Sequence, residues 1–192
     1  MLVTTADKRA NFRKLHESGC FIIPNPFDVG TAKALQRLGF KALASTSAGF
    51  AWTIGKADNR VTVDDVCDHL AAISSAVDVP VNADFEGGFA VKPEDVAINV
   101  GRAVKSGVSG LSIEDSTGDK QRPLFEASLA VERLKAARKA IDADHSSVLL
   151  TGRCEAFLWG VTDLKLVIER LQAYSAAGAD CSFCPGRVCS AR

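Results

Sequence analysis

The stretch Asn82-Ala83-Asp84-Phe85-Glu86-Gly87-Gly88-Phe89 marks the point where an apolar strand, predicted over residues 80–83, ends in two carboxylates. Asp84 and Glu86 are two positions apart, so an extended chain places both side chains on one face. Polar groups also follow the neighbouring predicted strands: Ser45, Thr46 and Ser47; Glu114 and Asp115; Arg153 and Glu155. Polar groups at four successive strand ends favour a barrel, because the carboxyl ends of all its strands converge on one site. In an open sheet the same groups would be strung out in a line.

Short apolar or β-branched runs alternate with stretches of helical periodicity along the whole chain, without a linker or low-complexity break. The predicted strands cover residues 21–24, 42–45, 80–83, 110–113, 147–151 and 179–183. The predicted helices cover residues 7–18, 28–38, 62–77, 93–106, 124–142 and 163–176. The third of these helices begins at Thr62 with a capping-box pattern that Asp65 completes. Strands that alternate with helices pair in parallel through right-handed crossovers. The sequence therefore predicts one α/β domain over residues 1–192, a (β/α)8 TIM-type barrel that is incomplete, with about six of its eight units present.

The composition argues against several classes of protein. The 192 residues are 47% hydrophobic and 24% charged, which is the balance of a soluble globular domain with a sizeable core. Lys plus Arg and Asp plus Glu both number 23, so the net charge is +0 and neither nucleic acid nor a membrane surface is a predicted partner. No apolar run reaches the roughly 18 to 20 residues of a membrane span, and no address signal is visible. We therefore expect a cytoplasmic protein.

Three carboxylates at neighbouring strand ends, Asp84, Glu86 and Glu114, offer hard oxygen donors for a metal ion. Mg²⁺ prefers octahedral oxygen coordination, keeps several waters and binds only one or two carboxylates directly, so it is the predicted cofactor. Zinc is not predicted, because no histidine accompanies these acids. The alternative interpretation is that acidic residues at strand ends merely cap the helices that follow. Arg153 supplies a planar cation that suits a carboxylate partner.

Six motifs, taken in their order along the chain, carry a resemblance to a known family. They are Pro24-Asn25-Pro26-Phe27-Asp28, Ser45-Thr46-Ser47-Ala48-Gly49, Gly55 to Asp58, Asp84-Phe85-Glu86-Gly87-Gly88-Phe89, Ile113-Glu114-Asp115 and Thr151-Gly152-Arg153. With these motifs the chain resembles the isocitrate lyase and phosphoenolpyruvate mutase superfamily, in its phosphonomutase-like and methylisocitrate lyase-like branch. The resemblance extends from about residue 12 to residue 186.

The resemblance implies a Mg²⁺ ion at the barrel mouth that coordinates the carboxylate and carbonyl oxygens of a small 2-oxo or 2-hydroxy acid. It implies that Asp84 binds this metal directly. It also implies that Asp58, Glu86 and Glu114 act through bound waters. The expected metal-binding set is therefore Asp84, Glu86 and Glu114.

The resemblance further implies how the substrate is bound and cleaved. Ser45, Thr46 and Ser47 would supply hydroxyl and backbone N–H groups to the substrate, and Arg153 would bind one of its carboxylates. Breaking a carbon–carbon bond next to a carbonyl leaves an enolate, whose oxygen charge fixed positive groups stabilise. The residues expected to act in catalysis are Arg153, Glu114 and Asp58.

The segment after the fourth predicted strand departs from the family pattern. Lyases for isocitrate and methylisocitrate carry a Lys-Lys-Cys-Gly-His gating loop here, whose Cys is an acid–base group. Residues 115–125 contain neither Cys nor His, and Lys120 is either their remaining acid–base candidate or a solvated charge. The predicted function is a Mg²⁺-dependent lyase that cleaves a carbon–carbon bond of small 2-oxo or 2-hydroxy dicarboxylic acids, with oxaloacetate-like or methylisocitrate-like substrates. Phosphonopyruvate mutase or hydrolase activity on the same scaffold is the alternative.

The carboxyl-terminal end raises a second alternative. After the sixth predicted strand the chain stops at Arg192, so strands seven and eight of a full barrel are missing. Unpaired outer strands expose backbone groups and the apolar interior. We therefore expect an open barrel with weak activity or none, and a non-catalytic truncated remnant is the rival hypothesis. The family resemblance implies homo-oligomers for the full-length form.

Overall fold

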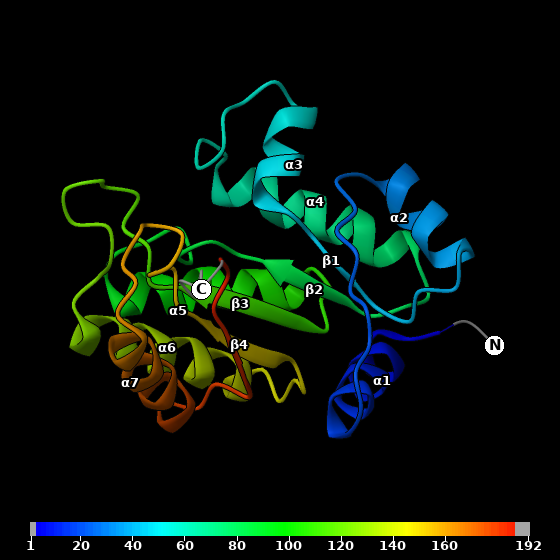
Figure 1. Cartoon of the computed structure of the whole chain (residues 1–192). Coiled ribbons are helices and arrows are strands. Elements are labelled where there is room, and N and C mark those ends of the chain that lie inside the picture. The colour runs from blue at the N-terminus through cyan, green and yellow to red at the C-terminus, as the bar shows by residue number, and fades with distance from the viewer. Residues whose placement is uncertain (1–2, 187–192) are drawn as a thin grey trace, which may run out of the picture.

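Five parallel strands form one curled sheet in the computed structural model, which describes residues 3–186 (Figure 1). The strands are β1 (Leu43–Ala44), β2 (Val81–Asp84), β3 (Gly110–Glu114), β4 (Leu149–Arg153) and β5 (Cys181–Phe183). Their order in the sheet is their order in the chain, β1-β2-β3-β4-β5. This winding, with a helical connection between successive strands, is that of a TIM-type barrel. The described residues therefore form an α/β half-barrel, as the sequence predicts for the fold class.

Seven helices accompany the sheet within residues 3–186. They are α1 (Thr5–Glu17), α2 (Val29–Arg37), α3 (Ser47–Thr53), α4 (Val63–Ala76), α5 (Pro93–Lys105), α6 (Ala127–Ala143) and α7 (Leu164–Ala176). Helices α4 to α7 connect successive strands and lie along the outer side of the sheet, while α3 lies above the ends of β1 and β2 (Figure 1). None of these helices is long and apolar enough to cross a membrane.

The main hydrophobic core lies between the sheet and the helices that cover it. Ala83, Leu111 and Leu150 contribute from three adjacent strands, and each is fully buried. Val100 of α5 and Leu134 of α6 pack into the same cluster. Strands that are buried on both faces, as β3 is, have the near-continuous apolar sequence of a parallel sheet covered by helices.

Helix α1 packs against the amino-terminal end of the sheet. Its Phe12 is buried, and a Cβ at Gly110, the first residue of β3, would lie 2.6 Å from the Phe12 ring, so only glycine fits there. The Nζ of Lys8 donates hydrogen bonds to the carbonyls of Ser74 and Val77 at 2.7 and 2.6 Å. These bonds satisfy carbonyls at the end of α4 that have no partner within the helix.

The prediction of a strand over residues 21–24 is wrong, and within the described residues the sheet has five strands rather than six. The segment lies beside β1, where the Ala44 N–H donates to the Pro24 carbonyl at 3.1 Å and the Asn25 side chain donates to the Ala44 carbonyl at 3.1 Å. Pro24 and Pro26 carry no N–H groups, so this segment does not continue the reciprocal backbone pairing that a strand needs.

Candidate active site

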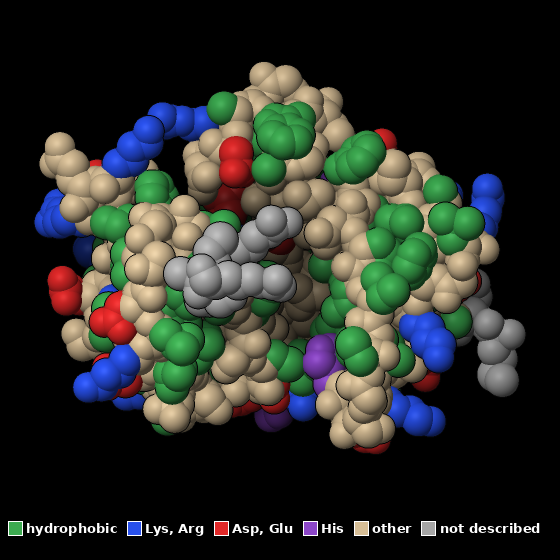
Figure 2. All heavy atoms as spheres, in the orientation of Figure 1, with side chains coloured by type: hydrophobic (Ala, Val, Ile, Leu, Met, Phe, Trp, Pro, Cys, Tyr) green, Lys and Arg blue, Asp and Glu red, His purple; other side chains and the backbone are tan. Residues whose placement is uncertain are grey.

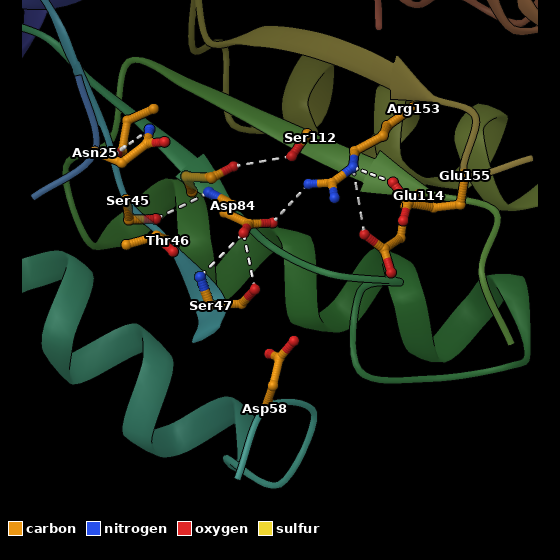
Figure 3. Close-up of polar contacts among 12 residues, drawn as sticks. Asn25, Ser45, Thr46, Ser47, Asp58, Asp84, Ser112, Glu114, Arg153 and Glu155 are labelled. Carbon is orange, nitrogen blue, oxygen red and sulfur yellow. Dashed lines mark hydrogen bonds and ion pairs between the residues drawn. The ribbon is translucent and has the colours of Figure 1, made fainter. Parts of the chain in front are cut away.

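The carboxyl ends of β2, β3 and β4 bring acidic side chains together around one arginine (Figure 3). The Arg153 guanidinium lies 3.3 Å from Asp84 Oδ1 and 3.6 Å from Glu114 Oε2, and its Nε donates to Glu155 Oε1 at 2.5 Å. The Arg153 side chain is only 18% exposed. Glu114 and Arg153 are register partners on adjacent parallel strands, which explains why they meet. The convergence expected from the strand ends is therefore present.

The residues that follow β1 form hydrogen bonds with Asp84 and with the first turn of α3. The Ser47 N–H and Oγ both donate to Asp84 Oδ2, at 3.0 and 2.9 Å, and Ser45 Oγ accepts the Asp84 N–H at 2.9 Å (Figure 3). Thr46 begins α3, since its Oγ1 accepts the Gly49 N–H at 3.2 Å. The Ser47 bonds hold one oxygen of the Asp84 carboxylate, and the Ser45 bond holds the Asp84 backbone.

Glu86 lies in the turn after β2, next to the cluster. Its backbone is in the left-handed region, with φ at 46°, and its Oε1 is buried without a hydrogen-bond partner among the described residues. Burial, together with the charges of Asp84 and Asp58, raises the pKa of Glu86 to about 7. Asp58 is exposed on the loop after α3, and its carboxylate points across a gap toward Asp84 and Ser47 (Figure 3).

The cluster holds more acids than cations. Burial raises the pKa of Glu114 to about 8, with Glu155, Asp84 and Glu86 adding to the shift and Arg153 opposing it. Burial also raises the pKa of Glu155. Burial opposes the charged form of Arg153, but the surrounding carboxylates raise the pKa of its guanidinium above the usual value. One arginine does not balance these acids, so the cluster favours an additional positive charge.

The donor set suits a hydrated Mg²⁺ ion. All candidate ligands are carboxylates, and the buried Glu86 Oε1 lacks a partner among the described residues. Within residues 3–186, no group of three or more His, Cys, Asp or Glu side chains is arranged to hold an ion directly. Mg²⁺ takes one or two carboxylates and completes its coordination with waters, so Asp84 as the direct ligand with water-mediated neighbours fits the residues present.

Two cavities open beside the cluster. One, of about 830 Å³, is lined by Asp84, Arg153 and Ser47 among others, and the second, of about 700 Å³, is lined by Glu86 and Glu114. Asp58 lines both cavities. Acidic side chains are visible at the floor of the hollow on this face of the molecule (Figure 2). A small anionic molecule together with a cation would have space at this end of the sheet.

Comparison with protein families identifies the chain. The model described as phosphoenolpyruvate phosphomutase matches residues 12–191. The chain belongs to the phosphoenolpyruvate phosphomutase family. The resemblance inferred from the six sequence motifs is therefore confirmed.

Curated relatives in this family have named activities. The 2-methylisocitrate lyase of Escherichia coli (strain K12) is 33% identical over 171 residues, which cover 83% of this chain and 57% of that protein. The oxaloacetate decarboxylase of Pseudomonas entomophila (strain L48) is 30% identical over 187 residues, which cover 91% of this chain and 61% of that protein. The chain thus spans between about half and two thirds of the length of the curated relatives that it matches.

Solved structures of the family share the fold. A candidate lyase/mutase from Burkholderia cenocepacia J2315 is 44% identical with a TM-score of 0.93, over 96% of this chain and 67% of that one. The structure of a phosphonopyruvate hydrolase in complex with oxalate and Mg²⁺ is 25% identical with a TM-score of 0.87, over 95% of this chain and 64% of that one. Both similarities support the parallel half-barrel described above.

Glu155, which had no predicted role, contacts Arg153 more closely than the two expected acids do. The sequence does contain a feature that points to Glu155: it follows Arg153 by two residues, the same spacing as between Asp84 and Glu86. Ser47 was predicted as a substrate ligand, and its two bonds to Asp84 were not predicted.

Proposed function

We propose that this cluster binds Mg²⁺ and serves an enzyme that cleaves a carbon–carbon bond of a small 2-oxo or 2-hydroxy dicarboxylic acid through an enolate. The observation that carries the proposal is the convergence of Asp84, Glu114 and Glu155 on Arg153 at the ends of adjacent parallel strands. The names of two relatives, a 2-methylisocitrate lyase and an oxaloacetate decarboxylase, support carbon–carbon cleavage. The Mg²⁺ and oxalate complex of a phosphonopyruvate hydrolase supports the choice of metal and of a small acid.

In this proposal Asp84 is the direct metal ligand, because its carboxylate lies at the centre of the cluster. Glu86, Glu114 and Asp58 surround it and accept hydrogen bonds from bound waters. When bound, Mg²⁺ acts as a Lewis acid that polarises the substrate carbonyl. Glu86 and Glu114, which burial makes hard to ionise, become easier to ionise beside an added positive charge.

The chain's own donors would bind and stabilise the reacting acid. Arg153 presents a planar guanidinium at a strand end, where it can pair with a substrate carboxylate. Ser45, Thr46 and Ser47 line the larger cavity, and the Ser47 N–H and hydroxyl, which donate to Asp84 in this structure, would orient the same molecule once they turn from Asp84 to the substrate. When the carbon–carbon bond breaks, its electron pair remains on the carbon next to the carbonyl. These fixed donors stabilise the charge that then develops on the enolate oxygen.

Calorimetry of Mg²⁺ binding tests the metal assignment. Asp84→Asn keeps the shape of the side chain and should abolish Mg²⁺ binding, while Asp78→Asn, which changes an exposed acid before β2 at the opposite end of the sheet, should not change it. Thermal melting of each variant establishes that it is folded. Unchanged affinity of folded Asp84→Asn for Mg²⁺ would contradict the assignment.

A substrate screen tests the reaction. We expect turnover of an oxaloacetate-like acid in the presence of Mg²⁺, followed by release of its cleavage products. Because residues 115–125 contain neither Cys nor His, isocitrate should not be cleaved at the rates normal for its lyases. Rapid cleavage of isocitrate would overturn this interpretation of the loop.

A phosphonopyruvate mutase or hydrolase is the second candidate, favoured by the similarity to a phosphonopyruvate hydrolase. The same donors would stabilise the enolate that forms when a carbon–phosphorus bond breaks. Phosphorus NMR of phosphonopyruvate incubated with the protein separates the two candidates.

Assembly into homo-oligomers also stays a prediction, and light scattering in solution tests it.

A further inference from the structure

Arg133 of α6 is almost completely buried, with an exposed fraction of 1%, yet it belongs to none of the groups described so far. Its Nη2 donates hydrogen bonds to the carbonyls of Gly87 and Ala90, the latter at 2.9 Å. Its guanidinium lies over the Phe125 ring, 3.9 Å from the centroid. A cation from a distant helix therefore binds the backbone of the turn that carries Glu86.

That turn has an uncommon backbone conformation. Glu86 and Phe89 have φ values of 46° and 56°, in the left-handed region that residues with a Cβ adopt at a cost. Such a conformation persists only where its surroundings hold it. Two further bonds hold the turn: the Glu114 N–H donates to the Glu86 carbonyl at 3.1 Å, and the Asn99 side chain donates to the Gly88 carbonyl at 2.9 Å.

The groups that Arg133 contacts indicate why this arginine is buried. A buried cation is costly unless it is paired with an anion and hydrogen-bonded. Among the described residues Arg133 forms no salt bridge; its Nη2 donates to the two carbonyls of the turn, and its Nε and Nη1 are buried without a partner. Burial lowers the pKa of Arg133 to about 10, with attraction from Asp115 and Glu114 opposing the shift, so the group stays charged at neutral pH. Holding the turn is the direct consequence of these contacts.

We propose that Arg133 is a positioning residue that clamps the turn at residues 85–90 and thereby sets the place of Glu86 beside the metal site. The contacts described above support the clamp itself, whereas its effect on Mg²⁺ binding rests on the proposed function. A guanidinium suits this task because one of its nitrogens, Nη2, reaches both carbonyls while its planar face packs on Phe125.

Hydrogen exchange tests the clamp independently of any activity. The reporting amides are those of Gly88, bonded to the Phe85 carbonyl at 2.9 Å, and Glu114, bonded to the Glu86 carbonyl. In Arg133→Met these amides should exchange about tenfold faster or more, because hydrogen bonds from a charged group are lost. Arg133→Lys keeps the charge but not the planar group that packs on Phe125, and should give an intermediate rate. Strand amides such as that of Leu111 should keep their wild-type rates, which identifies the effect as local.

Arg138→Met is the matched control on the same helix. Arg138 pairs with Asp142 at 2.8 Å and with Asp180 at 3.0 Å, away from the turn. This variant should leave the exchange of the turn unchanged even if it lowers overall stability. Wild-type exchange at Gly88 and Glu114 in both Arg133 variants would overturn the clamp, as would an equal acceleration in Arg138→Met.

Calorimetry then tests the link from the turn to the metal. Partners that orient metal-binding groups typically change metal affinity by about 10-fold to 100-fold when they are replaced, and we expect Arg133→Met to weaken Mg²⁺ binding within that range, with partial rescue in Arg133→Lys. Faster exchange with unchanged Mg²⁺ affinity would overturn the link and leave the clamp standing. Absence of Mg²⁺ binding in the wild-type protein would instead contradict the proposed function, while the exchange experiment still decides the clamp.

Discussion

Glu114→Gln tests the electrostatics of the acid cluster, because glutamine keeps the shape of the side chain and removes its charge. The Glu114 side chain is 12% exposed, and burial raises its pKa from 4.5 to about 8. In the unfolded chain the group loses its proton near pH 4.5, whereas in the folded protein it keeps the proton until about pH 8. Between these values the folded state binds more protons, so the free energy of unfolding of the wild-type protein falls as the pH rises.

The expected size of this change in stability follows from the raised pKa of Glu114. Each pH unit within this window lowers the stability of the wild-type protein by at most about 1.4 kcal/mol, which gives an upper bound of about 5 kcal/mol. Relaxation and water penetration reduce such effects, so we expect on the order of 2 kcal/mol. The variant also loses its attraction to Arg153, which lies 3.6 Å away and contributes about 1 kcal/mol or less. Glu114→Gln should therefore be about as stable as the wild-type protein near pH 5 and about 2 kcal/mol more stable near pH 8.

Urea denaturation at about pH 5, 6, 7 and 8, with a chelator present, measures this difference. Glu132→Gln is the control, because Glu132 is exposed and, among residues 3–186, pairs only with Lys135 on the helix surface. This variant should change stability by less than about 1 kcal/mol at every pH. If the advantage of Glu114→Gln does not grow with pH, the explanation by buried charge is refuted. Under the proposed function, Mg²⁺ at about 100 times its Kd raises the free energy of unfolding of the wild-type protein by about 2.7 kcal/mol. It raises that of the variant by less, so the difference in stability between the two proteins becomes smaller.

Three further substitutions test local features, each by urea denaturation. Tyr174→Phe removes the hydroxyl that donates to the buried Asp115 carboxylate at 2.5 Å and should cost about 1 to 3 kcal/mol; a neutral effect would contradict this bond. Gly49→Ala places a Cβ 2.6 Å from Thr46 Cγ2 at the start of α3 and should cost about 1 to 3 kcal/mol, so unchanged stability would contradict the close contact. Thr62→Ala removes the capping box of α4 and should cost about 1 kcal/mol, whereas Thr62→Ser should restore most of that loss.

Much of the fold could be predicted from the sequence because hydrophobic periodicity and capping residues are local signals. The helix predicted from Thr62 is observed as Val63–Ala76, with its capping box intact. The segment at residues 21–24 has the apolar composition of a strand, but Pro24 cannot donate to a neighbour. Helix α3 was not predicted, because its seven residues are too few to show periodicity. It depends on tertiary contacts such as the stacking of Phe50 on His69, with ring centroids 3.8 Å apart.

The composition of the candidate site was more predictable than its hydrogen bonds. Asp84, Glu114 and Arg153 each follow or end an apolar strand, and the carboxyl ends of parallel strands meet. When several hydrogen-bond acceptors lie close to one donor, the sequence alone does not determine which of them the donor binds. For that reason the bonds from Ser47 to Asp84 and the close pairing of Arg153 with Glu155 emerged only from the structure.

The ion pairs of the site also connect metal binding with substrate binding. Asp84 is engaged on both sides, with Oδ2 accepting from Ser47 and Oδ1 facing Arg153. Under the proposed function, a cation that takes Asp84 as its ligand would repel the Arg153 guanidinium, which lies 3.3 Å from Oδ1, and so would weaken that ion pair. The guanidinium would then be free to exchange Asp84 for a substrate carboxylate. Such an exchange would make the two binding events favour each other, and by linkage a bound acid would raise the affinity for the metal by the same factor. Buried carboxylates lower the stability of the fold when a single arginine only partly balances their charge. Under the proposed function, the coupling between metal and substrate binding would explain why they are buried.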